Sequence, residues 1–144
     1  CEILRRLALA KQAADFHAST LSQRVMARYL SDNDLDEHLA SVRTLYKANR
    51  DSMITACEKW FPESVSVTRP EGGMFLWVTL PKEIPAMELF RKAAGRHVSF
   101  IPGEAFFVRG GGKNEFRLNF SNVDRSDIEP GIKRIAEAIG EMIN

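Results

Sequence analysis

The sequence predicts an α+β fold in which helices cover a small sheet of three or four strands. Two kinds of periodicity support this fold. Apolar residues recur every three or four positions across 35–60 and again across 128–142, which is the helical period. Apolar and polar residues instead alternate at 65–67 and 116–120, which is the strand period. From residue 34 onward the expected order is helix, strand, strand, helix, strand, strand, helix, and this mixture is typical of an α+β layer.

The first thirty residues are expected to form two helices joined by a short polar bend. Asp34 and Glu37 then resemble a capping box, which would begin a helix of about seven turns that Pro62 ends. Because residues 1–33 carry no strand pattern, we expect them to belong to a neighbouring domain. Residues 34–144 are expected to form a domain of their own.

One segment stands out among the expected strands. Residues 72–80, GGMFLWVTL, follow a turn and are apolar on both faces. Such a strand is expected at the centre of the sheet with a cover on each side. Shorter strands are expected at 65–67, 97–103 and 116–120.

Two further helices complete the predicted fold. One begins at Pro85, a first-turn proline, and stops at Gly95. Its expected buried residues are Met87, Phe90 and Ala94. Ser126 and Glu129 resemble a capping box at the start of the last helix. The residues of that helix expected to be buried are Ile128, Ile132, Ile135, Ile139 and Met142.

The composition argues against several classes of function. The 144 residues include 20 basic and 19 acidic side chains, a formal charge of +1, so neither nucleic acid nor an anionic membrane is expected as the main partner. No apolar run could span a bilayer and no secretory signal is present. Cys1 and Cys57 are isolated, which leaves a single disulfide open but favours reduced thiols, so a cytoplasmic protein is expected. A chain that begins with Cys is expected to be a fragment.

Several catalytic motifs are incomplete or missing in the sequence. The loop GGGKN at 110–114 lacks the Ser or Thr and the following helix of a P-loop, so a hairpin loop is expected there. His17, His38 and His97 have no metal-binding spacing, and no metal site is expected. No G-x-S-x-G nucleophile motif occurs.

Arg117 is the candidate for binding chemistry. It lies in a predicted strand with Asn119 on the same polar face. A guanidinium offers a planar fork of donors that matches a carboxylate, and Asn119 could add hydrogen bonds. The residue pattern leaves two alternatives open, a pair with an internal Asp or Glu and a side chain extended to solvent. Gly72 and Gly73 are expected to form a turn, which could also let a ligand approach the backbone.

Three sequence blocks occur in a fixed order, TRPEGGMFLWVTLP at 68–81, VSFIPGEAFF at 98–107 and NEFRLNFSNVD at 114–124. With the closing amphipathic helix they resemble the C-terminal part of class I/II aminotransferases, which are fold-type I pyridoxal-phosphate enzymes. The resemblance covers essentially the whole chain and is closest to the branch of 2-aminoadipate and aromatic aminotransferases. It implies that 34–144 is the small C-terminal domain, preceded by a long interdomain helix, and that 1–33 is a remnant of the large cofactor-binding domain.

The resemblance also implies roles for particular residues. Arg117 matches the family arginine that holds the α-carboxylate of the amino-acid or 2-oxo-acid substrate. The resemblance gives no role to Asn119; from the residue pattern alone, Asn119, Gly72 and Gly73 are candidates for a supporting layer around Arg117. No lysine of this chain has the serine-rich setting of the family's Schiff-base lysine, which is therefore expected upstream of residue 1. The intact protein is expected to be a homodimeric aminotransferase that uses pyridoxal phosphate. This fragment alone is expected to bind no pyridoxal phosphate and to be inactive.

Two alternatives to an enzyme remain open. The same domain occurs behind a winged-helix DNA-binding module in transcription regulators, where ligand sensing replaces turnover. A free-standing module could also have kept the fold and lost the chemistry. The gene sequence upstream of Cys1 separates these three possibilities.

Overall fold

A computed structural model of the chain describes residues 2–15 and 17–143. The chain divides into two compact units, Cys1–Ser41 and Val42–Asn144. The long helix α3, Leu35–Trp60, contributes residues to both units. Its 26 residues correspond to about seven turns, which confirms the predicted length.

The first unit is helical throughout its described residues apart from short connections, as predicted. Helix α1 spans Glu2–Ala14 and α2 spans Thr20–Asp32. Asp34 caps α3 as expected, because its Oδ1 accepts hydrogen bonds from the backbone N–H groups of residues 36 and 37. No residue of α1 or α2 is buried, so their apolar side chains are exposed. These side chains include Ile3, Leu4, Leu7, Leu21, Val25 and Leu30.

The second unit contains a four-stranded sheet with the strand order β1-β2-β4-β3, and every neighbouring pair is antiparallel. The strands are β1 Ser66–Val67, β2 Phe75–Thr79, β3 Ile101–Pro102 and β4 Glu115–Asn119. This sheet confirms the predicted α+β class and the expected number of strands. Strands β2 and β4 occupy the two central positions and pair along their full length.

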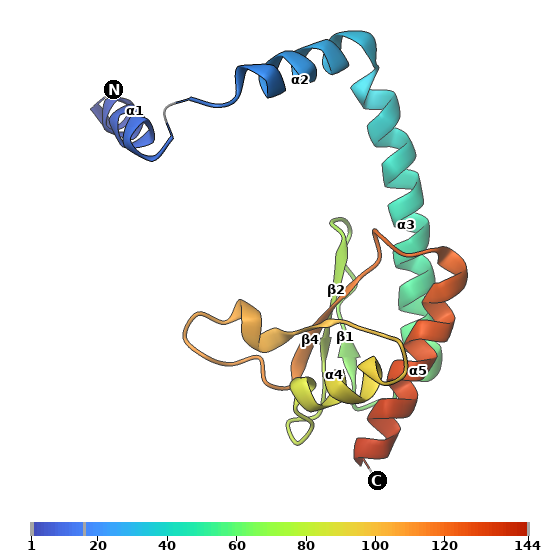
Figure 1. Ribbon diagram of the computed structural model, residues 1–144. Helices are drawn as coiled ribbons and strands as arrows, with labels where there is room; N and C mark the ends of the chain where they lie inside the picture. Colours follow the sequence, from blue (N-terminus) through green and yellow to red (C-terminus); the bar gives the residue numbers. More distant parts are fainter. Residues whose placement is uncertain (1, 16, 144) are drawn as a thin grey trace. The chain divides into compact units, whose positions relative to one another are not determined.

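The core lies on one face of the sheet, against α3, α4 (Ala86–Ala94) and α5 (Arg125–Ile143). Strands β2 and β4 contribute Leu76, Val78, Phe116 and Leu118 to that face, all 5% exposed or less. Figure 1 shows α5 in red beside the lower part of α3, and an ion pair between Lys59 and Glu129 joins these helices. All of the covering helices therefore serve the same face.

This one-sided cover corrects the prediction that β2 is covered on both faces. Phe75, Trp77 and Thr79 are only half-buried, whereas Leu76 and Val78 are fully buried. Among the described residues, the second face of the sheet is covered by the 3-10 helix η1, Gly103–Phe106, and by the loop that follows it. Apolar residues on both faces of a strand thus did not require a helix on each side.

The stripe predicted for α4 is wrong by one position. Met87 and Ala94 are exposed and Phe90 is half-buried, whereas the buried residues are Ala86, Leu89 and Ala93. Both triplets are apolar and have the same helical spacing, so periodicity could not choose between them. The helix begins directly after Pro85, which occupies the cap position instead of the first turn.

Helix α5 begins at Arg125, so Ser126 lies inside its first turn and the predicted capping box does not form. Glu129 instead accepts hydrogen bonds from Lys59 Nζ at 2.6 Å and Trp60 Nε1 at 3.1 Å. These bonds, with Lys59 contributing most, lower the pKa of the Glu129 carboxyl group. The predicted isoleucines are buried, and Met142 packs against them.

Cys57 is a free, buried thiol in α3. The sequence left a disulfide between Cys1 and Cys57 open, and Cys1 lies outside the described residues. Burial, with a smaller contribution from the charge of Glu58, raises the pKa of the Cys57 thiol to about 12. Among the described residues, no helix is long and apolar enough to cross a membrane.

Candidate functional site

The face of the sheet opposite the core carries the polar residues that the sequence singled out. Trp77 on β2 lies directly across from Arg117 on β4, and Phe75 lies across from Asn119. Side chains alternate along a strand, so the residues between these, Leu76 and Leu118, point into the core. The same two strands thus build the core on one face and the candidate site on the other.

Two aromatic rings contact the Arg117 guanidinium. Its Cζ atom lies 3.8 Å from the ring centre of Phe75 and 4.4 Å from that of Phe106. The side chain is half-buried, and its buried Nε atom has no hydrogen-bond partner within 2–15 and 17–143. A cation over an aromatic face is attracted by the ring quadrupole, but that contact does not replace a hydrogen-bond acceptor.

Arg117 also has no ion-pair partner among residues 2–15 and 17–143, where the other ion pairs of the chain are found. Of the two alternatives left open by the residue pattern, the internal pair with Asp or Glu is therefore not present in this part of the chain. The second alternative, extension to solvent, holds only in part, because two rings cover one side of the guanidinium and its Nε atom is buried. A half-buried cation with spare donors is suited to binding an anion.

A pocket of about 730 Å³ lies beside Arg117. Phe75 and Asn119 border it together with Arg117, and so do the segment 97–101 and the first half of α5. Within the described residues no lysine lines this pocket. Arg134 and Asp127 of α5 also line it. The pocket therefore offers two cations and one carboxylate, but no amine that could bond covalently to a carbonyl.

Asn119 closes the turn after β4. Its Oδ1 accepts hydrogen bonds from the backbone N–H of Ser121 at 2.7 Å, from Ser121 Oγ at 2.8 Å and from the backbone N–H of Asn122 at 3.3 Å. This arrangement is an Asx turn, which fixes where the strand ends. Asn119 borders the pocket, but its acceptor oxygen is already engaged.

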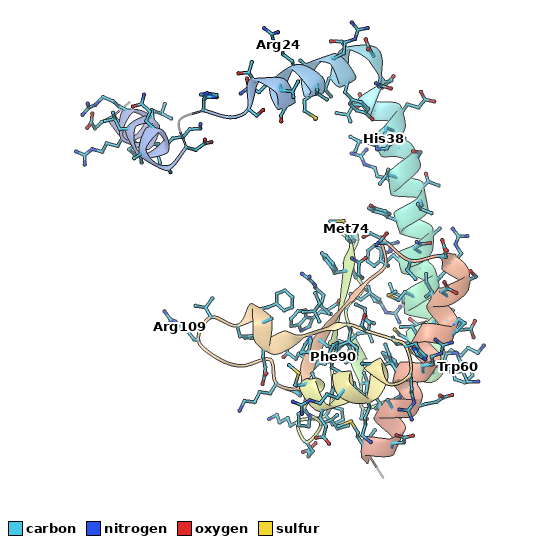
Figure 2. All side chains as sticks on the ribbon, in the orientation of Figure 1. Arg24, His38, Trp60, Met74, Phe90 and Arg109 are labelled. Atoms are coloured by element: carbon cyan, nitrogen blue, oxygen red, sulfur yellow. The ribbon has the colours of Figure 1, made fainter. Side chains whose placement is uncertain are left out.

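Gly72 and Gly73 lie in the exposed turn before β2, next to Met74, which Figure 2 labels. Gly73 has a φ of +82°, a conformation that favours glycine. Both glycines line a second pocket, of about 470 Å³, with basic residues of α3, and Arg117 does not line it. The structure thus separates the glycine turn from the Arg117 pocket.

Two neighbouring side chains of α3 hold the ends of the site strands. The Nδ2 group of Asn49 donates to the backbone oxygens of Phe120 at 3.0 Å and Val123 at 3.1 Å, beyond the end of β4. Arg50 Nη1 donates to the backbone oxygens of residues 70 and 71, ahead of β2, both at 3.1 Å. Asn49 is 1% exposed, and its two bonds, one buried and one partly buried, fix the end of β4 to the helix.

Sequence reasoning missed Phe106, although the block VSFIPGEAFF contains it. Phe106 lies in no periodic element, so neither the helical nor the strand pattern assigned it to a face. The signal that could have found it is a pair of aromatic residues in an otherwise polar loop, since large apolar side chains in loops often cover a site. The loop GGGKN leads from η1 into β4, in agreement with the hairpin-loop prediction.

The sequence of this chain is similar to those of several known proteins. The family described as aminotransferase class I and II matches residues 2–135. An aromatic-amino-acid aminotransferase of Thermococcus litoralis is 43% identical over 138 residues, which are 96% of this chain and 33% of the relative. An uncharacterised HTH-type transcriptional regulator of Bacillus subtilis, YisV, is 34% identical over 94% of this chain and 28% of its own length.

A solved structure has the same fold. The α-aminoadipate aminotransferase LysN of Thermus thermophilus, complexed with N-(5'-phosphopyridoxyl)-L-leucine, superposes with a TM-score of 0.90 at 39% identity. The match covers 99% of this chain and 36% of that one, so the chain spans about a third of the length of the relatives it matches. The family match over nearly the whole chain and the shared fold lead to one conclusion: this chain belongs to the aminotransferase class I and II family.

Proposed function

We propose that this chain is the substrate-carboxylate-binding part of a pyridoxal-phosphate-dependent aminotransferase. The intact protein would move an amino group between an amino acid and a 2-oxo acid. The observation that carries the proposal is the Arg117 guanidinium, which is half-buried, contacts two rings and has an unpartnered Nε atom. A buried donor without an acceptor costs free energy, and a carboxylate of the substrate would supply the missing acceptors.

The contribution of Arg117 to the reaction would be binding and orientation. All amino acids and 2-oxo acids share one carboxylate next to the reacting carbon, so a planar fork that holds this group fixes the position of that carbon. Correct orientation of a bound reactant lowers the free-energy barrier of its reaction. In the best model reactions the barrier falls by on the order of 7–11 kcal/mol. The rings of Phe75 and Phe106 shield part of the guanidinium from water and would strengthen its attraction for a carboxylate.

Pyridoxal phosphate would withdraw electrons from the substrate carbon when it is bound in the intact protein. The described residues around Arg117 do not fit that cofactor by themselves, because no lysine lines the pocket. We therefore assign the cofactor to sequence beyond this chain, with residues 1–33 as part of the large cofactor-binding domain. A homodimeric assembly is part of the same proposal.

The decisive experiment uses the full gene product with Arg117→Lys, which keeps the charge and loses the bidentate fork. We expect kcat/KM to fall for every substrate, by about 2–5 kcal/mol of transition-state stabilisation. The matched control is Arg109→Lys, the same change at an exposed arginine at the tip of the loop in Figure 2. Unchanged kinetic constants for all substrates of the Arg117 variant would refute the assignment.

A ligand-sensing regulator is the second candidate, because the regulator YisV is 34% identical over 94% of this chain. The gene sequence upstream of Cys1 distinguishes the candidates. An upstream segment about twice the length of this chain, with a lysine in a serine-rich setting, supports the enzyme. An additional basic helix-turn-helix supports the regulator, and a start codon directly before Cys1 contradicts both.

A further inference from the structure

The loop between β3 and β4 carries Phe106 to the guanidinium of Arg117. Phe106 ends η1, and its ring centre lies 4.4 Å from the Cζ atom of Arg117. The next residues form an exposed tip, where Val108 is fully exposed. One part of the loop, at Phe106, therefore contacts the candidate site, while the tip at Val108 is exposed to solvent.

Two glycines fix the base of this loop. A Cβ atom added to Gly103 would lie 2.7 Å from the backbone oxygen of Gly112 and 2.8 Å from that of Glu115. A Cβ atom added to Gly112 would lie 2.8 Å from the backbone carbon of Gly103 and 2.6 Å from the ring of Phe107. Backbone atoms cannot move aside as a flexible side chain can, so only glycines allow this close approach.

A second aromatic contact supports Phe106 from the sheet. The ring of Trp77 meets that of Phe106 edge-to-face, with the centres 5.4 Å apart and the planes at 74°. Trp77 is itself held, because its Nε1 donates a hydrogen bond of 2.8 Å to Glu115 Oε2. Edge-to-face pairs have a preferred geometry, so this contact favours one placement of the Phe106 ring.

We propose that Phe106 is a positioning residue for Arg117, and that the Gly103–Gly112 contact at the base of its loop holds it there. The guanidinium has no hydrogen bond or ion pair from the described residues that could fix its plane, so the aromatic contacts must do so. Phe106 does not need to touch the substrate for this role. The inference rests on the proposed carboxylate-binding function of Arg117 and explains how that side chain is oriented before a carboxylate arrives.

The test compares four variants of this chain. Phe106→Leu removes the ring, Phe106→Tyr keeps it, Gly103→Ala displaces the loop base, and Val108→Ala alters only the exposed tip. Phe106 is 41% exposed and outside the core, so the core of the second unit stays intact in the Leu variant. The first measurement is the NMR signal of the Arg117 Nε–Hε group, which reports ring contact, and the second is titration with sodium pyruvate as a simple 2-oxo acid.

We expect Phe106→Leu and Gly103→Ala to shift the Nε–Hε signal and to weaken pyruvate binding by about 3- to 10-fold. Phe106→Tyr should restore both readings, and Val108→Ala should leave both unchanged. An unshifted Nε–Hε signal in Phe106→Leu overturns the inference, even if pyruvate binding falls. Failure of the tyrosine variant to restore the signal also overturns it.

Failure of the proposed function gives a different result. If pyruvate does not perturb the Arg117 signal of the unmodified chain at any concentration, then Arg117 has no carboxylate role in this chain. The Nε–Hε shifts of the four variants still decide whether Phe106 holds the guanidinium. A large shift in Phe106→Leu with rescue by tyrosine supports the holding contact independently of ligand binding.

Discussion

The two faces of the sheet are built from alternate residues of the same strands, yet they are held in different ways. On the core face, Phe116 and Leu76 are fully buried among side chains of three helices. On the other face, Arg117 is held by two ring contacts and has an unpartnered Nε atom. One face therefore stabilises the fold, while the other keeps a cation whose hydrogen-bond donors lack acceptors, as functional sites often do.

The largest expected effect comes from breaking the core face. Phe116→Ala removes a fully buried ring and should lower the free energy of unfolding by about 3–5 kcal/mol. The matched change on the opposite face is Ile101→Ala, because Ile101 pairs with Arg117 and is 44% exposed. It should cost less than about 1.5 kcal/mol. Urea unfolding followed by circular dichroism measures both, and equal losses would contradict the division between the faces.

The bonds that fix β4 to α3 should have the next largest effect. Asn49→Ala removes a buried hydrogen bond to the backbone oxygen of Phe120 and a partly buried one to that of Val123, and should cost about 2–3 kcal/mol. Asn119→Ala is the control, because the Asx turn it closes is exposed and its loss should cost about 1 kcal/mol or less. The same urea experiment compares them. If Asn119→Ala lowered the free energy of unfolding as much as Asn49→Ala, the bonds from Asn49 of α3 would not be the main interactions that fix the end of β4.

Arg117→Met separates stability from binding. The substitution replaces a half-buried cation that lacks an acceptor by an apolar side chain of similar length, so the free energy of unfolding should change by no more than about 1 kcal/mol. Binding of pyruvate should be lost at the same time. Urea unfolding and the pyruvate titration test the two halves. A loss of stability as large as that of Phe116→Ala would place Arg117 among the residues that maintain the fold.

The smallest expected effect concerns the contact between α3 and α5. The pKa of Glu129 is lowered by its bonds to Lys59 and Trp60, so the folded state favours the charged carboxylate. That stabilisation is fully present above the ordinary carboxyl pKa and is lost as the pH falls below it through the lowered pKa of the folded state. Glu129→Gln should therefore be less stable than the unmodified chain near pH 6, and the difference should shrink by pH 3. Urea midpoints at several pH values measure this, and a difference between the two proteins that stays constant from pH 6 to pH 3 would contradict it.

The fold was largely predictable because its signals are local. The helical period of residues 35–60, the Asp34 cap and the strand alternation at 116–120 each depend on neighbours in the sequence. The predictions were wrong where the sequence pattern allowed two local arrangements equally well. The buried stripe of α4 moved by one residue because two apolar triplets share the same spacing, and the helix begins at Ala86. The predicted capping box would have used the Glu129 side chain, but in the structure that side chain accepts hydrogen bonds from Lys59 and Trp60 of α3.

By itself, the sequence determined the α+β class, the place of Arg117 on the strand face away from the core, and the resemblance to class I/II aminotransferases. Only the tertiary structure decided what surrounds Arg117. Phe75 and Phe106 come from segments 31 residues apart in the sequence, and neither has a local pattern that directs it to a guanidinium. The one-sided helical cover was also decided by packing, since apolar residues on both faces of β2 allow either arrangement. The period of the apolar residues shows which face of a helix or strand is apolar. Which segment packs against that face depends on the folding of the whole chain.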